Sequence, residues 1–344
     1  MLTVSDLQNL ERDENGRLIL DSMVEHADYL VKEEDKGKRR KRWFSFSDND
    51  VLVKDVKEDT YEDYAELLVE QLCRQIGLPS AHYDLATYQG RPCVITEKFI
   101  KKKTEKLLSG KIFMEDSLKY LEDNELYFRK SKGDQKELNN LEMIERCLAF
   151  YLSDEKAKEV MKNFDMLFAL NCFCYNGDIH LSNWSVIYDY KADPSYRMSP
   201  NYDAGGYFHF NLNKGNIFKH ARNLMRQSKI EQKIKILEDQ IFGKDYNKHN
   251  GLNYKYSSTD ELGLTRLEEA FRAEPDRFAP IFQKLMEIDP YEAIINVEKQ
   301  LGVKSLPDEC VDWFISVIEA SQERLSYIVN SYYFQKESES SYGV

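Results

Sequence analysis

Residues 164–174, FDMLFALNCFC, limit how this chain can fold more than any other segment, because nearly all of their side chains are apolar. A helix that is apolar on every side must be enclosed by other elements. No run of about 18 apolar residues occurs anywhere in the chain, so we expect no membrane-spanning helix. The segment therefore predicts a helix that is buried on all sides within a folded core.

Composition and charge narrow the class of protein. The chain has 344 residues, with 22 Tyr and 18 Phe, and this aromatic content argues for a folded protein. The length suits one large domain or two lobes that share an interface. The 60 acidic and 48 basic residues give a net charge of −12, which disfavours a general nucleic-acid binder. A local basic patch could still recruit an anion.

The N-terminus and the cysteines indicate a cytoplasmic protein. The opening residues, MLTVSDLQNLERDENG, have neither the basic start nor the apolar core of a signal peptide. The six cysteines are scattered through apolar segments, and only Cys172 and Cys174 are close in sequence. A lone C-x-C pair is a weak indication of a metal site. We therefore expect reduced, buried thiols.

The first hundred residues predict a small sheet that carries one helix. We expect strands at residues 43–47, 51–56, 82–88 and 92–96, with a helix at residues 60–76 between the second and the third strand. Thr60, followed three residues later by Asp63, resembles a capping box at the start of the helix. Gly77 is expected to end it. Turn residues between the strands predict two hairpins.

The rest of the chain is expected to be mostly helical. Residues 101–161 show apolar side chains at helical spacing, and amphipathic helices return beyond Ala221, the last over about residues 312–332. A third hairpin is expected at residues 184–188 and 196–198. The chain thus predicts an α+β fold of two lobes, a β-rich N-lobe over residues 1–99 and a larger helical C-lobe over residues 100–344.

The stretch GDIHLSNW, between the buried helix and this hairpin, contains the main candidates for catalytic residues. Asp178 is followed five residues later by Asn183, and Asp203 comes after the hairpin. This order and spacing are typical of phosphoryl transfer. The first aspartate would accept the proton of the attacking hydroxyl. The asparagine and the second aspartate would supply oxygens to Mg²⁺, which prefers hard oxygen ligands.

The small lobe supplies two further candidates. A cation on a strand, paired with a carboxylate on the following helix, clamps the α- and β-phosphates of a nucleotide. Lys54 in VLVKDV and Glu66 in the middle of the predicted helix fit these positions. Glu62 and Glu70 on the same helix are competitors for the role of Glu66.

The pieces VLVK, AELLVEQLCRQIGLPS, VITEKF, NGDIHLSNWSVI and MSPNYDAGG together resemble the HipA-like serine/threonine kinases over about residues 38–206. The resemblance implies a two-lobed protein-kinase-like fold. It also implies transfer of the γ-phosphoryl group of ATP, with Mg²⁺, to Ser or Thr of a protein substrate. The roles that it implies are a catalytic base at Asp178, magnesium ligands at Asn183 and Asp203, a phosphate-binding Lys54 oriented by Glu66, adenine-binding backbone groups at Glu97 and Phe99, and a histidine, His180, that braces the loop or a phosphate.

The chain departs from the family pattern near its N-terminus. Only 53 residues precede Lys54, which fits a compact form without the extra N-terminal subdomain of longer members. The phosphate-covering loop of the family is usually rich in Gly and Ser, whereas here it reads KGKRRK over residues 36–41. Lys38 and Arg39 would replace some of its backbone N–H donors, although such a run can equally be a solvated turn. The loop holds no Ser that could be phosphorylated.

Two other functions fit the same residues. One is a small-molecule or lipid kinase, because aminoglycoside, choline and phosphoinositide kinases use a similar loop ahead of the Asn. The other is a catalytically degenerate kinase fold whose Gly-poor loop no longer binds ATP. The resemblance also suggests a helix-turn-helix antitoxin-type protein partner, while we expect no direct contact with nucleic acid and none with a membrane.

Overall fold

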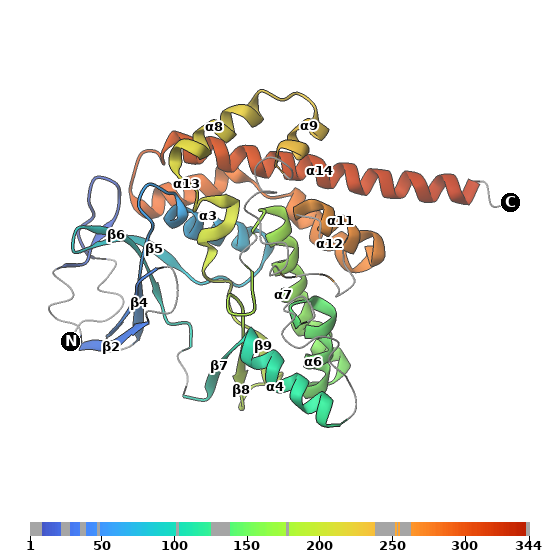
Figure 1. The fold of residues 1–344 in the computed structure, drawn as a ribbon, viewed down its shortest axis with the longest axis horizontal. Coiled ribbons are helices and arrows are strands. Elements are labelled where there is room, and N and C mark those ends of the chain that lie inside the picture. Colours follow the sequence, from blue (N-terminus) through green and yellow to red (C-terminus); the bar gives the residue numbers. More distant parts are fainter. Residues whose placement is uncertain are drawn as a thin grey trace.

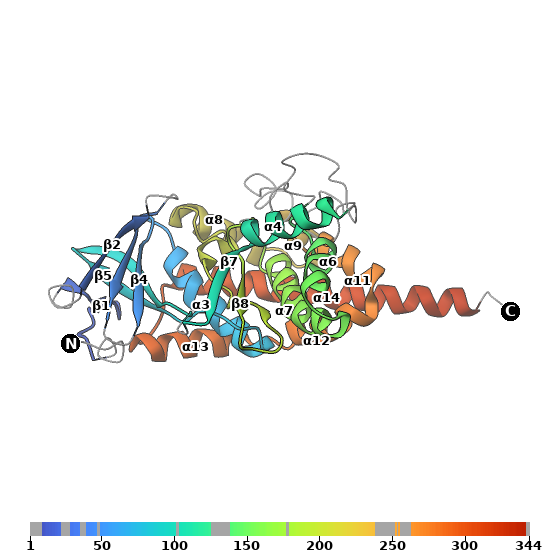
Figure 2. The ribbon, with the colours of Figure 1, turned by 90° about the horizontal axis from the view of Figure 1, so that it is seen from below.

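The computed structural model describes residues 9–21, 28–34, 39–46, 49–100, 103–124, 138–176, 179–237, 252, 254 and 263–341. Lys38 and Asp178, two of the predicted site residues, lie outside this part of the chain. The larger of two sheets lies at one end of the molecule and most of the helices lie toward the other, where helix α14 (Asp308–Ser341) projects beyond the rest (Figures 1 and 2). The expected α+β fold is confirmed.

A six-stranded sheet forms the β-rich end, in the order β1-β5-β6-β4-β3-β2. Neighbouring strands are antiparallel, except for the parallel pair β1 and β5. Burial alternates along β3, so one face of the sheet covers a small core of its own. The strands are β1 (Leu18–Ile19), β2 (Asp28–Glu34), β3 (Lys41–Ser45), β4 (Asp50–Asp55), β5 (Tyr83–Tyr88) and β6 (Arg91–Glu97).

Both hairpins predicted for this sheet are confirmed. Strand β3 pairs with β4, with Lys41 opposite Lys54. Strands β5 and β6 are joined by Gln89 and Gly90, whose φ angles of 53° and 70° are typical of a tight two-residue turn. Strands β1 and β2 were not expected. Strand β2 pairs with β3, and the basic run of residues 36–41 ends at Lys41, the first residue of β3.

Helix α3 (Glu62–Ile76) connects the sheet to the helical end (Figure 1). Nearly all of its residues are buried, and its apolar side chains belong to the same core as helices α7 (Asp154–Phe173) and α13 (Pro290–Leu301). The small core of the sheet is separate from this one. The position of α3 is therefore set mainly by the helical end of the molecule.

The prediction for α3 is right at the C-terminal end of the helix and wrong at its N-terminal end. The C-terminal end is as expected, because Gly77 adopts the left-handed conformation with φ of 75°. The expected capping box is wrong. The residue before the helix is Tyr61, without a side-chain cap, and Thr60 Oγ1 donates instead to the carbonyl of Lys57 at 2.7 Å.

A second sheet has three strands in the order β7-β8-β9: β7 (Glu105–Ser109), β8 (Ser185–Asp189) and β9 (Tyr196–Met198). The predicted hairpin is formed by β8 and β9, which are antiparallel. Strand β7 lies where the sequence predicted helix, and this part of the prediction is wrong. The partner of β7 is β8, about 80 residues later in the chain, so its pairing does not appear in the local pattern.

The remaining described elements are helical: α4 (Gly110–Asp123), α6 (Leu141–Tyr151), α7, the 3₁₀ helix η1 (Ala204–His209), α8 (Lys214–Met225), α9 (Ile230–Lys235), α11 (Gly263–Ala273), α12 (Pro275–Met286), α13 and α14. Residues 164–173 of α7 are all buried, which confirms the prediction made from their composition. Helix α14 extends beyond both predicted ends.

Two further expectations concern the state of the cysteines and the presence of a membrane-spanning helix. All six cysteine thiols are buried and none is joined in a disulfide, as predicted. Within the described ranges, no helix combines the length and the apolar character needed to cross a membrane.

Candidate active site

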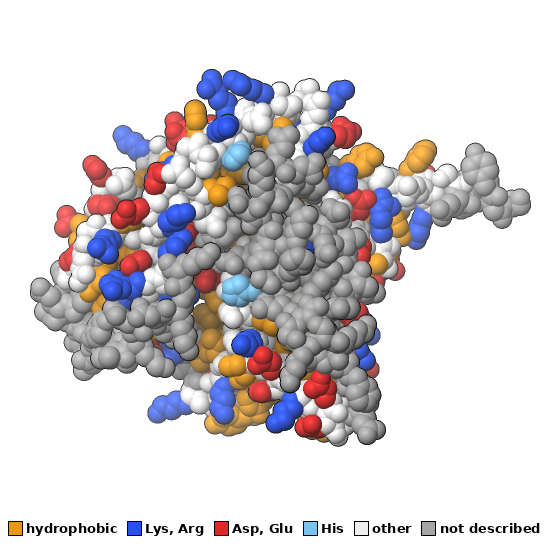
Figure 3. Space-filling view, in the orientation of Figure 1, with side chains coloured by type: hydrophobic (Ala, Val, Ile, Leu, Met, Phe, Trp, Pro, Cys, Tyr) orange, Lys and Arg blue, Asp and Glu red, His pale blue; other side chains and the backbone are white. Residues whose placement is uncertain are grey.

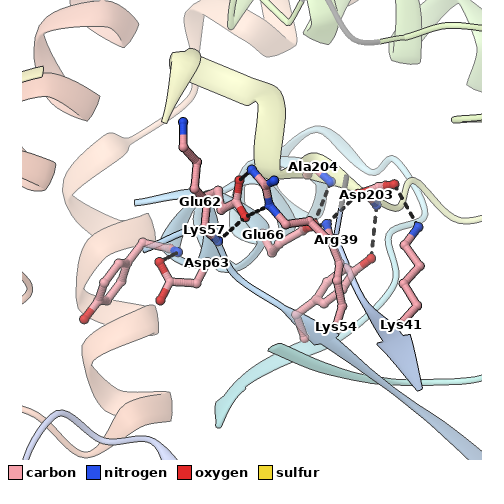
Figure 4. A network of polar contacts seen from close by, with 11 residues as sticks. Arg39, Lys41, Lys54, Lys57, Glu62, Asp63, Glu66, Asp203 and Ala204 are labelled. Atoms are coloured by element: carbon pink, nitrogen blue, oxygen red, sulfur yellow. Dashed lines mark hydrogen bonds and ion pairs between the residues drawn. The ribbon is translucent and has the colours of Figure 1, made fainter. Parts of the chain in front are cut away.

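Lys54, the fifth residue of β4, points from the sheet toward α3 (Figure 4). Its Nζ donates to Glu66 Oε1 at 2.7 Å and to Asp203 Oδ1 at 2.5 Å. Lys54 is only 8% exposed and Glu66 only 2%. A strand, a helix and a loop that are distant in sequence therefore meet at one buried ammonium group.

Glu66 also contacts the loop that carries Asp203. Its second oxygen, Oε2, accepts a hydrogen bond from the backbone N–H of Ala204 at 2.6 Å. The loop packs against α3 here, since a Cβ added to Gly205 would lie 3.4 Å from the Glu62 carbonyl oxygen. Glu66 thus holds both the strand lysine and the start of η1.

Asp203 has an unusual backbone conformation. Its φ of 59° and ψ of 50° lie in the left-handed region, which Asp tolerates better than most residues. Its backbone N–H donates to Tyr83 Oη at 3.1 Å. Residues held in such conformations by their surroundings are frequent at functional sites.

Lys41 provides a second cation next to Asp203. Its Nζ lies 3.4 Å from Asp203 Oδ2, and in the β3–β4 hairpin it is directly opposite Lys54. Like charges directly across two strands repel each other. Here the carboxylate of Asp203 contacts both ammonium groups and offsets the repulsion. We call Lys41, Lys54, Glu66 and Asp203 the Lys54 cluster.

The charges of the cluster fix its protonation. Burial acts to lower the pKa of Lys54, but the carboxylates of Glu66 and Asp203 raise it well above its usual value. Burial acts to raise the pKa of Asp203, but Lys54 and Lys41 hold it well below its usual value. Burial raises the pKa of Glu66, and Lys54 opposes this. Near neutral pH the cluster therefore keeps a charged lysine beside an ionised Asp203.

The glutamates of α3 have different partners. Glu66 contacts Lys54, whereas Glu70 Oε1 lies 2.9 Å from His82 Nδ1. Glu62 binds Arg39 through two hydrogen bonds, of 2.7 and 2.9 Å. Of the two cations of the basic loop that are predicted to contact phosphate, Arg39 is therefore held by the first turn of α3 (Figure 4). Its role toward a nucleotide stays a prediction, as does that of Lys38.

The loop that ends in Asn183 is braced by His180. The His180 Nδ1 accepts a hydrogen bond from the backbone N–H of Ser182 at 3.2 Å, and its carbonyl accepts one from the N–H of Asn183 at 2.8 Å. Asn183 is buried, with 8% of its surface exposed. The position of Asn183 is therefore set by a compact turn immediately before β8.

Tyr202 joins this turn to the loop of Asp203. Its Oη donates to the carbonyl of Ser182 at 3.2 Å and shares a hydrogen bond of 2.7 Å with Ser185 Oγ. Its ring stacks on Phe99, with 5.8 Å between ring centroids. Phe99, which lies between strands β6 and β7, thus contacts Tyr202, the residue that precedes Asp203.

Glu97 and Phe99 were predicted to bind adenine through their backbone groups, and these contacts stay a prediction. The Glu97 side chain has another partner, because its Oε2 accepts a hydrogen bond from Asn49 Nδ2 at 3.0 Å.

The donor set fits a magnesium ion. Asp203 offers a carboxylate that stays ionised and Asn183 offers an amide oxygen, and both are hard oxygen donors. Among the residues that the structure describes, no cluster of three or more His, Cys, Asp or Glu side chains suggests another kind of metal site. Binding of Mg²⁺ by Asn183 and Asp203 stays a prediction from the sequence, because in this structure the two Asp203 oxygens contact Lys54 and Lys41.

Sequence reasoning missed part of the site. Tyr83, which accepts from the Asp203 N–H, gave no signal because tyrosines are common in strands. Lys41 was considered only as part of the basic loop. The hairpin register would have shown that it shares a sheet face with Lys54.

Known proteins similar to this chain are found both among family models and among solved structures. The HipA-like C-terminal domain family matches residues 23–273. The fold is similar to the Helicobacter pylori proinflammatory kinase CtkA, with a TM-score of 0.62 and 12% identity over 92% of this chain and 98% of that one. It is also similar to a chain in the Shewanella oneidensis MR-1 toxin–antitoxin complex of HipA, HipB and operator DNA, with a TM-score of 0.50 and 12% identity over 90% and 71% of the two chains. Comparison with curated proteins gave no match.

Proposed function

The chain belongs to the family of HipA-like C-terminal domains, and we propose that it is a protein kinase that transfers the γ-phosphoryl group of ATP to Ser or Thr hydroxyls. The observation that carries this proposal is the buried Lys54, held between Glu66 and Asp203. A lysine fixed in this way is suited to bind nucleotide phosphates, because its charge and direction are set before the ligand arrives.

Each residue has a role in this proposal. Lys54 would bind the α- and β-phosphates and Glu66 would keep it oriented, between a small lobe of residues 1–99 and a larger lobe of residues 100–344. Asn183 and Asp203 would hold Mg²⁺, which would supply positive charge to offset that of the phosphates. Asp178 would accept the proton of the substrate hydroxyl.

A protein partner is part of the proposal. A structural relative comes from a complex of HipA, HipB and operator DNA. We propose an antitoxin-type protein partner for this chain as well. The net charge of −12 favours contact with DNA through such a partner rather than directly.

Two conservative substitutions test the catalytic assignment. Asp203→Asn and Asp178→Asn should each abolish phosphoryl transfer and leave the fold intact, because both keep the size of the side chain and remove its charge. Transfer is measured with radiolabelled ATP, and folding by circular dichroism and thermal melting. Activity at the wild-type level in either variant would refute the assignment.

The same preparation separates the two alternatives. Phosphoamino-acid analysis, run beside a panel of aminoglycosides, choline and phosphoinositides, shows whether the acceptor is a protein or a small molecule. ATP with Mg²⁺ should raise the melting temperature, since a ligand that binds only the folded state stabilises it by mass action. The absence of any shift would favour a degenerate fold that binds no nucleotide.

A further inference from the structure

Helices α8 and α9 carry a local excess of positive charge in an acidic protein. Residues 214–235 contain seven lysines and arginines and a single carboxylate, that of Glu231, whereas the whole chain has a net charge of −12. The two helices lie along the top of the molecule in Figure 1, and Lys and Arg side chains gather over the same region in Figure 3.

Helix α8 has one buried and one exposed side. The buried side packs against α14 through Ile217, Ala221 and Leu224. On the other side, Lys219, Arg222 and Arg226 are exposed. Their spacing of three and four residues puts them in a row along the outward face of the helix.

Two apolar side chains accompany these cations. Phe218 is 48% exposed and Met225 is 61% exposed. They are seven residues apart, so they form a short apolar stripe beside the row of cations. We call Phe218, Lys219, Arg222, Met225 and Arg226 the α8 basic face.

The cations of this face have no partner among the described residues. Lys233 in α9, by comparison, pairs with Glu323 of α14 at 3.3 Å. In the part of the chain that the structure describes, no carboxylate lies within ion-pair distance of Lys219, Arg222 or Arg226. Their charges are therefore available to a ligand at little cost in desolvation.

We propose that the α8 basic face docks an acidic segment of a protein partner. Carboxylates of the segment would pair with Lys219, Arg222 and Arg226, and an apolar side chain would cover Phe218 and Met225. This mixed chemistry fits an amphipathic acidic peptide, in which both kinds of side chain recur at helical spacing.

Two other anionic ligands fit the face less well. A nucleic acid would satisfy the cations but would bring phosphates, rather than apolar side chains, to Phe218 and Met225. Binding to an anionic membrane needs a broad apolar helix face that can insert. The broad apolar face of α8 is already packed against α14.

The position of α8 connects this face to the rest of the molecule. The N–H of Lys214, the first residue of the helix, donates to the carbonyl of Asp59 at 3.0 Å. The Lys214 Nζ lies 4.8 Å from the centroid of the Tyr61 ring. The helix is thus anchored to the segment that precedes α3. The proposed docking needs no phosphoryl transfer, so it can be tested by binding alone.

Fluorescence anisotropy with the full chain tests the proposal. The probe is a fluorescein-labelled peptide with Glu and Leu at helical spacing, compared with a DNA duplex of equal charge and with anionic lipid vesicles. The test variants are Arg222→Glu/Arg226→Glu and Phe218→Ser. Lys111→Glu/Lys119→Glu is the matched control, since it reverses two exposed lysines on α4.

The wild type should bind the peptide in preference to DNA and vesicles. The Arg222→Glu/Arg226→Glu variant should bind it at least about tenfold more weakly, because two attractive charges become repulsive. Phe218→Ser should also weaken binding, and the control should not. The proposal is overturned if the wild type does not bind, if DNA or vesicles bind more tightly, or if Phe218→Ser has no effect. It is also overturned if sedimentation shows that the face joins two copies of this chain.

Discussion

The Lys54 cluster and the α8 basic face both gather cations, but they differ in burial and in partners. Lys54 is 8% exposed and contacts two carboxylates, whereas Arg222 and Arg226 are exposed and have no carboxylate partner among the described residues. A buried charge destabilises the fold unless it is paired, while an exposed one costs little. Charged side chains that are buried and paired are held in a fixed position, which is suited to catalysis. Exposed charge is suited to reversible binding.

Removing the buried cation should have the largest effect. In Lys54→Met, Glu66 is left buried without its ammonium partner, so we expect the free energy of unfolding to fall by about 3 kcal/mol. Phosphoryl transfer should be lost as well. Urea unfolding measures the first effect and radiolabelled ATP the second.

Lys57→Met is the matched control, because Lys57 is exposed and its Nζ contacts only the carbonyl of Asn211 among the described residues. It should change stability by less than about 0.5 kcal/mol. Equal losses in the two variants would contradict the contrast between buried and exposed cations.

The Arg39–Glu62 pair lies between these extremes, with 24% and 8% of the two side chains exposed. A double-mutant cycle with Arg39→Met and Glu62→Gln should give a coupling energy of about 1 kcal/mol, because the pair is bidentate and partly buried. Unfolding of the wild type, both single variants and the double variant measures it. A coupling near zero would mean that Arg39 is not held by α3 in solution.

The smallest effect is expected at His82, whose side chain is 55% exposed and whose Nδ1 lies 2.9 Å from Glu70 Oε1. The hydrogen bond to Glu70 is the main cause of a raised His82 pKa, and burial opposes it. Because the folded-state pKa is raised, the stabilisation is complete below about pH 6.5, the usual pKa of histidine. It is lost as the pH rises through the folded-state value.

Thermal melting of the wild type and His82→Gln across this pH range measures the contribution. The wild type should be the more stable protein at low pH by less than about 1 kcal/mol, and the difference should disappear at high pH. A difference that does not change with pH would show that the pair does not titrate as described.

Much of the fold could be predicted because its strongest signals are local. Short β-rich runs on either side of turn residues predicted the β3–β4 and β5–β6 hairpins, and an almost wholly apolar composition predicted the buried part of α7. The order of these elements placed Lys54 on a strand and Glu66 on the next helix, and the structure brings the two side chains into contact.

The remainder depends on contacts between distant segments. Strand β7 is recognisable only through its pairing with β8. The left-handed conformation of Asp203, its bond to Tyr83 and the second lysine beside it all arise from tertiary packing. Thr60 was expected to cap α3, but its hydroxyl donates to the carbonyl of Lys57, a local hydrogen bond that competes with capping.

A crystal structure with Mg²⁺ and a non-hydrolysable ATP analogue tests most directly whether the Lys54 cluster is a nucleotide site. We predict that Lys54 Nζ contacts phosphate oxygens of the analogue, and that Asn183 and Asp203 ligate the metal. An analogue bound elsewhere, or bound with Lys54 directed away from its phosphates, would contradict the account.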